Sequence, residues 1–175
     1  MTEKEPTIKL VRHGLSDAND RNKMHTPLFG HPDAGLMDIG IEQARNLTPL
    51  FKSRYGLDLA AARVATSWMR RTFETALEAG VREENITRYP LLDEVSTRLS
   101  REEIIQTLHD EVPPPAAIEQ IKELRANPPE EEVWFTHGLV IATLMYDCDI
   151  PYIKFVPKHG TVIEVPRRKI IEKTV

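Results

Sequence analysis

Ile8-Lys9-Leu10-Val11-Arg12-His13-Gly14 joins a mostly apolar run of strand length to a histidine between an arginine and a glycine. Such a run, stopped by polar residues and glycine, predicts a buried strand. A neutral imidazole can attack phosphorus, an arginine offers a planar fork of donors, and glycine lets backbone N–H groups approach an anion. The tripeptide therefore indicates phosphate chemistry at a strand end, although a polar turn after a strand would have the same three residues.

Three more runs of strand length follow, and helical patterns lie between most of them: 63–66, 132–136 and 161–165. This alternation is typical of an α/β protein, because helices between strands cover the faces of one sheet. We expect a three-layer sandwich with a mostly parallel central sheet flanked by helices. A chain of 175 residues fits a single domain, 1–175.

Two helices are expected directly after strands or turns. Asp38 is a plausible N-cap for an apolar pattern that ends near Gly56, and Ser67 precedes a second pattern that ends at Gly80. Arginines stand in the first turns of the second helix.

Residues 91–129 read as a small helical insertion. Ser100 and Glu103 have the spacing of a capping box, and a run of three prolines separates two short helices. The segments 161–165 and 169–175 are expected to form a C-terminal edge hairpin. Such an edge strand could pair two subunits into a homodimer.

Bulk composition narrows the classes of protein. The chain is 41% hydrophobic and 29% charged, has a net charge of −4, and contains one cysteine, Cys148. The net charge argues against general nucleic-acid binding. No apolar stretch approaches the length of a membrane span, and the polar start does not resemble a secretion signal, so we expect a cytoplasmic protein without membrane contact. Cys148 is expected to be a buried small residue.

Four ordered motifs resemble those of the histidine phosphatase superfamily, which includes phosphoglycerate mutases. The motifs are Arg12-His13-Gly14-x-Ser16-x-x-Asn19, the segment from Gly35 to Ala44, the segment from Val64 to Ala76, and Val133-Trp134-Phe135-Thr136-His137-Gly138. Together they span roughly residues 7 to 165. Their order along the chain is far more specific than any one of them.

This resemblance implies roles for particular residues. His13 would be the nucleophile that forms a phosphohistidine, with its other ring nitrogen donating to a fixed acceptor such as a backbone carbonyl. Arg12 and Arg71 would hold the phosphoryl oxygens, and Arg71 is preferred over Arg70 because it keeps the family spacing. His137 would stabilise the transferring group, and backbone N–H groups of the helix after Gly138 could add donors.

An acid must protonate the leaving oxygen, and Glu94 is the candidate, with Asp93 as the alternative one register away. Asn19 is expected to bind the phosphate or the substrate, and Ser16 to contribute a phosphate contact or a helix cap. The loop 22–33, which includes Gly30, is expected to form a wall of the pocket.

Several other polar residues stay ambiguous in the sequence. His25, His31 and Asp33 could suggest a metal site, but arginines and histidines already supply positive charge, so no metal and no cofactor is expected. His159 is interpreted as a solvent-facing turn residue. Additional negative charge on a substrate could be bound by Arg98, Arg101, Lys154 or Lys158.

Departures from the family pattern favour hydrolysis. Leu15 stands where phosphoglycerate mutases have glutamate, and the residues after Glu94 differ from the run that follows the acid in those mutases. The leading hypothesis is therefore a metal-independent phosphatase acting through phosphohistidine on a phosphorylated small molecule or a phosphoprotein. A phosphomutase and a non-catalytic phospho-ligand binding domain are the alternatives.

Overall fold

A five-stranded sheet with the order β3-β2-β4-β1-β5 organises the computed structural model, which describes residues 5–95, 99–151 and 155–171. The first four strands in this order run parallel, and β5 pairs antiparallel with β1. The strands are β1 (Thr7–Arg12), β2 (Val64–Thr66), β3 (Ile86–Arg88), β4 (Val133–Thr136) and β5 (Val162–Pro166).

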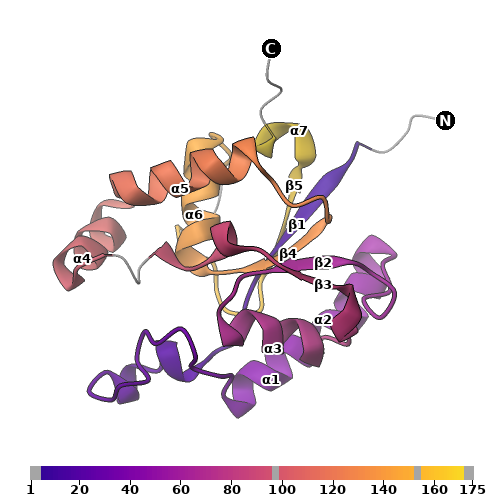
Figure 1. Cartoon of the computed structure of the whole chain (residues 1–175), viewed down its shortest axis with the longest axis horizontal. Coiled ribbons are helices and arrows are strands. Elements are labelled where there is room, and N and C mark those ends of the chain that lie inside the picture. Colours follow the sequence, from indigo (N-terminus) through magenta and orange to yellow (C-terminus); the bar gives the residue numbers. More distant parts are fainter. Residues whose placement is uncertain (1–4, 96–98, 152–154, 172–175) are drawn as a thin grey trace.

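Helices cover both faces of this sheet, as Figure 1 shows. The fold class is therefore the mostly parallel α/β sandwich that the sequence predicts. The α-helices of the described part are α1 (Asp38–Arg45), α2 (Leu47–Leu50), α3 (Arg70–Glu78), α4 (Arg101–Asp110), α5 (Pro115–Ala126), α6 (Gly138–Asp147) and α7 (Arg167–Ile170). A π-helical turn, Phe51–Tyr55, continues α2.

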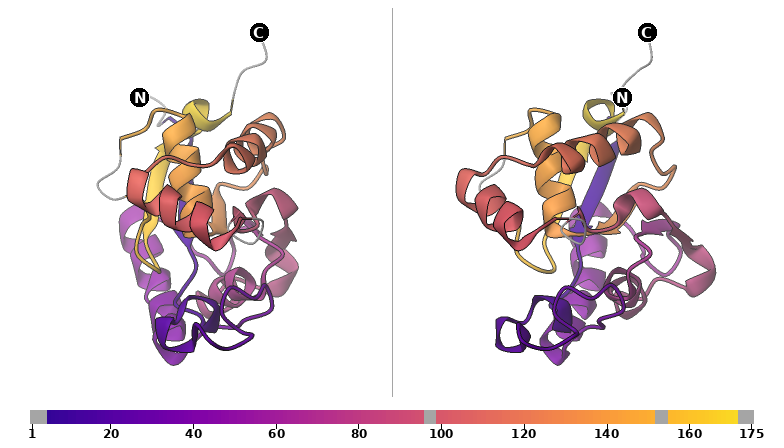
Figure 2. Two further views of the ribbon diagram at one scale, coloured as in Figure 1. Left: turned by 90° about the vertical axis from the view of Figure 1, so that its left-hand side faces the viewer. Right: turned by 60° about the vertical axis from the view of Figure 1, so that its left-hand side comes forward.

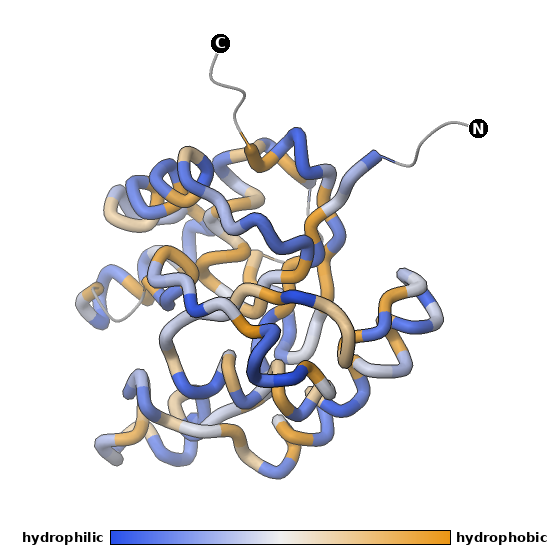
Figure 3. Tube along the Cα trace, turned by 45° about the vertical axis from the view of Figure 1, so that its right-hand side comes forward, coloured by the Kyte–Doolittle hydropathy of each residue, from blue (hydrophilic) through white to orange (hydrophobic). Residues whose placement is uncertain are grey.

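Alternating side chains of the strands separate the core into two layers. Ile8 and Leu10 of β1 pack with α5 and α6, whereas Val11 packs with α2 and α3 on the other face. In β4, Trp134 joins the first cluster and its two neighbours join the second. Figure 3 shows hydrophobic residues concentrated along these central strands.

The connections after β1 and β4 leave the sheet on opposite faces. The connection after β1 packs against the Val11 side through α2, and α6, which follows β4, packs on the Leu10 side. Because β1 and β4 are neighbours, their carboxyl ends form a crevice of the kind in which open α/β sheets bind ligands.

The helical insertion expected over 91–129 is present as α4 and α5. The capping box forms, with Ser100 Oγ accepting from Glu103 N–H and the Glu103 carboxylate accepting from Ser100 N–H. Figures 1 and 2 show α4 at the outer end of α5, on the same side of the molecule as the loop after β1.

The prediction of a C-terminal edge hairpin was wrong in its second half. β5 forms the edge strand, but the next residues turn into the short helix α7, and residues 172–175 lie outside the described part. Ile170 of α7 is fully buried in the core cluster of α5 and α6, so tertiary burial favours a helical turn over a second strand.

Three local expectations also need correction. Asp38 is the first residue of α1, with Met37 in the N-cap position. The helix after Ser67 begins later, at Arg70. Strand β3 was not anticipated, because Ile86–Arg88 is short and carries polar residues at the sheet edge.

In the described residues, no helix has the length and apolar character needed to cross a bilayer.

Candidate active site

His13 and His137 meet at the carboxyl ends of β1 and β4. Arg12 pairs with Thr136 in the parallel register, and the N–H of His13 donates to the carbonyl of Thr136 at 3.0 Å. The next residue on each strand is therefore a histidine at the same sheet edge. The two ring centroids are 5.0 Å apart at an interplanar angle of 63°, so the two imidazoles border one small space.

The tautomer of His13 follows from its backbone contact. Its Nδ1 lies 2.6 Å from the carbonyl oxygen of Gly14, which can only accept. Nδ1 therefore carries the proton, and Nε2 keeps its lone pair. The ring is 1% exposed, and burial, together with Arg71 and Arg12, lowers the pKa of His13 well below 6.5. This is the neutral, oriented imidazole that a nucleophile requires.

His137 is held from the opposite side by Ser67. Its Nε2 lies 2.9 Å from Ser67 Oγ, which also accepts from Met69 N–H and lies 2.8 Å from Thr72 Oγ1. The buried Nδ1 has no hydrogen-bond partner among the residues that the structure describes. Burial and the nearby Arg71 lower the pKa of His137 well below 6.5. One ring nitrogen is thus anchored, and the other is left for a ligand.

Arg12 and Arg71 bring two guanidinium groups to the same space. Arg12 Nη1 donates to the carbonyl of Pro157, and Arg71, 2% exposed, donates to the carbonyl of His31 at 3.1 Å. The Nε atom of each arginine is buried and unpartnered within the described ranges. Both groups therefore retain N–H donors for another acceptor. Arg70, by contrast, is an exposed residue paired with Glu74, as expected from its position on the helix.

The two buried guanidinium groups are influenced by one another and by the acidic pair 93–94. Burial, and the neighbouring Arg71, lower the pKa of Arg12 to about 10 against the opposing effect of Glu94. Burial also lowers the pKa of Arg71. An anion would offset both the desolvation and the mutual repulsion of these groups.

The acidic pair 93–94 divides between two tasks. Asp93 Oδ1 accepts from Trp68 N–H at 2.7 Å, which ties it to the turn before α3. The negative charge of Glu94 raises the pKa of both Arg12 and Arg71, against the effect of burial. Glu94 Oε1 also accepts from Val95 N–H at 3.0 Å, and Asp93 acts on Arg71 as well. The choice between Glu94 and Asp93 as the acid stays a prediction.

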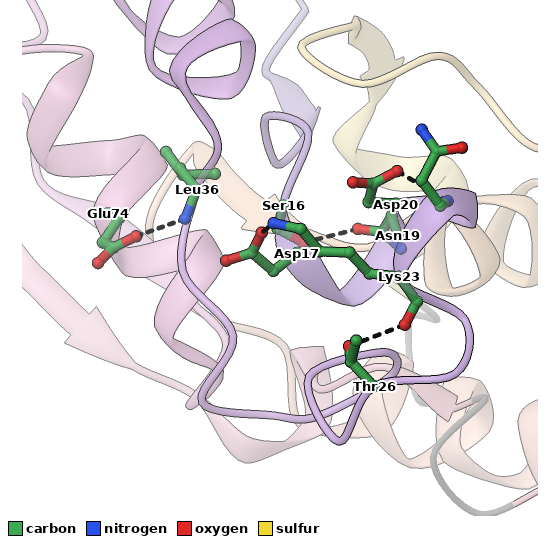
Figure 4. A network of polar contacts seen from close by, with 9 residues as sticks. Ser16, Asp17, Asn19, Asp20, Lys23, Thr26, Leu36 and Glu74 are labelled. Carbon is green, nitrogen blue, oxygen red and sulfur yellow. Dashed lines mark hydrogen bonds and ion pairs between the residues drawn. The ribbon is translucent and has the colours of Figure 1, made fainter.

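Ser16 and Asn19 stabilise the loop that follows β1 (Figure 4). Ser16 is fully buried, and its hydroxyl donates to Asn19 Oδ1 at 2.8 Å. This contact uses the Ser16 proton and fixes the Asn19 amide with its NH₂ group as the remaining donor. A phosphate contact of Asn19 or Ser16 stays a prediction.

Two further contacts hold the same loop. Lys23 is paired with Asp17, and Glu74 of α3 accepts from Leu36 N–H at 2.7 Å.

Two glycines of the predicted site differ in their surroundings. A Cβ at Gly138 would lie 2.6 Å from Val156 Cγ1 and 2.9 Å from Arg12 Cζ, so glycine here lets the start of α6 pack on the guanidinium group. Gly30 is exposed, has φ of 72°, and donates its N–H to the carbonyl of Ala18. Its single donor is therefore used within the loop, and its predicted substrate contact is not supported by a free N–H.

His159 is not the solvent-facing residue that we expected from its turn. Its ring centroid lies 5.4 Å from that of His13, and its Nε2 is buried. The sequence could not place it, because only the antiparallel pairing of β5 with β1 brings this turn across the end of β1.

The remaining candidates of the sequence are less informative. Cys148 is partly buried at the end of α6, and Arg101 and Lys158 are exposed. Arg98 and Lys154 lie outside the described residues. Over the ranges that the structure describes, no group of three or more His, Cys, Asp or Glu side chains is arranged to hold a metal ion, and His31 Nδ1 accepts from Asp33 N–H.

Comparison with known proteins places this arrangement in a class of phosphoryl-transfer proteins. The model of the histidine phosphatase superfamily (branch 1) matches residues 8–115. The chain belongs to this superfamily, which includes phosphatases and phosphomutases. No curated protein matches the sequence.

Solved structures share the fold. The Thermus thermophilus protein TTHB049 is 23% identical over 93% of this chain and 95% of its own, with a TM-score of 0.63. A structure described as phosphoglycerate mutase from the same organism is 22% identical over 93% and 95%, with a TM-score of 0.62. Mycobacterial hydrolase 1 is 16% identical over 91% and 88%, with a TM-score of 0.60.

Proposed function

We propose that the chain is a metal-independent phosphatase that hydrolyses phosphate monoesters through a phosphohistidine at His13. The observation that carries this proposal is the His13 ring itself. Its Nδ1 proton is held by the Gly14 carbonyl, and unpartnered polar atoms of Arg12, Arg71 and His137 lie in the surrounding site. A phosphoryl group supplies the oxygens that such donors require.

In the first step, His13 Nε2 attacks phosphorus and the bond from phosphorus to the leaving oxygen breaks. Arg12, Arg71 and His137 stabilise the charge on the three remaining oxygens. Glu94 gives its proton to the leaving oxygen. A phosphate dianion would become a partner of the two arginines, which favours the neutral carboxylic acid on Glu94.

In the second step, water attacks the phosphohistidine while Glu94 takes a proton from it. The N–P bond breaks, its electron pair returns to Nε2, and inorganic phosphate leaves. The first-formed alcohol and this phosphate balance the hydrolysis of one ester. The substrate is a phosphorylated small molecule or a phosphoprotein side chain. The charged groups described here bind the phosphate, so they select for a phosphate monoester and not for the group that carries it.

The test is to detect the intermediate and follow the oxygen. The protein is mixed with a panel of sugar phosphates, nucleotides, phosphoglycerates and phosphopeptides in the presence of chelator, then quenched in alkali, in which phosphohistidine survives. Intact-mass measurement should show one phosphoryl group on the wild type and on His25→Ala, whose histidine is exposed. His13→Ala should carry none and release no phosphate.

Hydrolysis in ¹⁸O-labelled water separates the two enzyme functions. A phosphatase releases phosphate with one solvent oxygen, whereas a mutase returns the group to a second hydroxyl of the substrate. Binding of phosphate without either product would identify a non-catalytic domain. Phosphate release that persists in His13→Ala and stops in chelator would overturn the mechanism.

A further inference from the structure

The turn that carries His159 is hydrogen-bonded to the end of β1. The N–H of Gly160 donates to the carbonyl of Arg12 at 3.0 Å and lies 3.3 Å from that of His13. The N–H of Arg12 in turn donates to the carbonyl of Thr161 at 3.0 Å. The backbone that follows His159 is thus bonded to the residues that present the candidate nucleophile, so the turn that carries His159 is held next to His13.

His159 is less buried than His137 but resembles it in two respects. Its ring lies 5.4 Å from the His13 ring, compared with 5.0 Å for His137. Like Nδ1 of His137, its Nε2 is buried without a hydrogen-bond partner in the described part of the chain. A buried polar nitrogen left unpaired is unfavourable, and this cost is removed when a ligand supplies the missing partner.

The charges that act on His159 are positive. Burial, together with Arg12 at the end of β1 and Arg71 on α3, lowers its pKa to about 4. The imidazole is therefore neutral in the free protein near neutral pH. A phosphoryl group between these cations would reverse the local field and favour an N–H donor on His159.

We propose that His159 is a third imidazole of the phosphate site and donates through Nε2 to a phosphoryl oxygen of the group that His13 attacks. This inference rests on the proposed function, because it assigns a further substrate contact to the same site. His159 would bind the phosphoryl group of any monoester, and it would contact inorganic phosphate as well. It follows that the loop before β5 contributes directly to phosphate affinity.

Two substitutions distinguish the loss of the N–H donor from the loss of the ring. His159→Phe keeps a planar ring in the turn and removes both nitrogens, whereas His159→Gln removes the ring and keeps an N–H donor near the position of Nε2. His109→Phe is the matched control, because His109 is an exposed histidine on α4. Each variant is first checked for an unchanged circular dichroism spectrum.

The measurement is the dissociation constant for inorganic phosphate and for orthovanadate by calorimetry, alongside kcat and KM. We expect His159→Phe to raise the dissociation constants of both anions by about tenfold or more, as for loss of a hydrogen bond to a charged group. His159→Gln should recover most of this lost affinity. His109→Phe should bind like the wild type. In the wild type, ¹⁵N imidazole spectra should show the His159 resonances shifting on addition of phosphate.

Other outcomes overturn the inference. If His159→Phe binds phosphate like the wild type, or if both variants lose binding equally, Nε2 is not the donor, and the phosphohistidine at His13 still stands. If the wild type binds neither anion and forms no phosphohistidine, the proposed function fails and this inference fails with it.

Discussion

Ser67 Oγ lies 2.9 Å from Nε2 of His137, and this contact joins the turn after β2 to the end of β4. The same oxygen accepts from Met69 N–H and contacts Thr72 Oγ1, whose hydroxyl reaches the carbonyl of Met69 at 2.8 Å. Ser67 Oγ accepts from Met69 N–H, and the Thr72 proton can go to the Met69 carbonyl, so the Ser67 hydroxyl can donate its own proton to Nε2 of His137. This arrangement puts the proton of the neutral ring on Nδ1. It orients His137 with Nδ1 as the nitrogen left for a ligand.

Replacing Ser67 should remove the hydrogen bond that orients the His137 ring. In Ser67→Ala the buried Nε2 and the Met69 N–H lose their partner, so we expect kcat/KM to fall by roughly tenfold to a hundredfold, as for an unsatisfied buried polar group. The comparison is Ser53→Ala, which replaces an exposed serine whose hydroxyl donates to the Leu50 carbonyl in its own helical turn. Steady-state kinetics on one phosphate ester measures both, and equal activities would show that Ser67 does not position His137.

The general acid can be identified by how strongly its replacement lowers kcat/KM on substrates with different leaving groups. Glu94→Gln should lose about 10²-fold to 10⁴-fold in kcat/KM on an alkyl phosphate, the contribution of a general acid, and much less on p-nitrophenyl phosphate. Asp93→Asn keeps an oxygen for Trp68 N–H and should be active on both substrates. A selective loss on the alkyl ester in Asp93→Asn instead would exchange the two roles.

Close backbone packing behind His13 should make Gly14 intolerant of a side chain. A Cβ at Gly14 would lie 2.4 Å from the carbonyl oxygen of Gly40, so Gly14→Ala must displace the backbone beside the nucleophile. We expect a stability loss of about 1–3 kcal/mol, as for overpacking, together with loss of activity.

Gly56→Ala is the control for this prediction. Gly56 has φ of 68° with nothing near its Cβ position, so alanine there should cost about 1–2 kcal/mol through backbone strain while leaving activity intact. Urea unfolding and kinetics measure both variants. Full activity in Gly14→Ala would mean that the contact with Gly40 does not position His13.

Stability should fall as the pH is lowered through the histidine range. The pKa values of His13 and His137 are well below 6.5 in the folded state, so below about pH 6.5 the unfolded chain binds more protons than the folded chain. Each ring therefore adds up to about 1.4 kcal/mol per pH unit to the slope of the unfolding free energy, which rises with pH. His159 adds to this slope down to its folded pKa of about 4.

The measurement is the free energy of unfolding in urea between pH 4.5 and pH 7.5. His13→Ala and His137→Ala should each flatten the curve by about one proton, because the alanine variants have no ring to protonate. A curve that is already flat in the wild type would place these histidines in a solvated environment.

Local pattern was enough for the main features of the fold. The apolar run of β1, the capping box at Ser100 and the glycine at position 56 each act within a few residues, so the sequence predicts the strand, the helix start and the turn correctly. The family predicted from the ordered motifs is confirmed by a family model that matches residues 8–115 and so includes the His13 motif. The carbonyl contact expected at the second nitrogen of His13 is present in the structure.

Tertiary contacts decided what local pattern could not. The burial of Ile170 turned the expected hairpin strand into α7, and the pairing of β5 with β1 brought His159 to His13. The contact of Asp93 with the Trp68 N–H likewise joins residues that are remote in sequence. The sequence by itself therefore determined most of the elements and the family, and it singled out His13 and His137, since these follow from short-range periodicity and motif order. Which polar atoms are left without partners around His13 was decided only by folding, because burial and pairing across the sheet are properties of distant segments brought together.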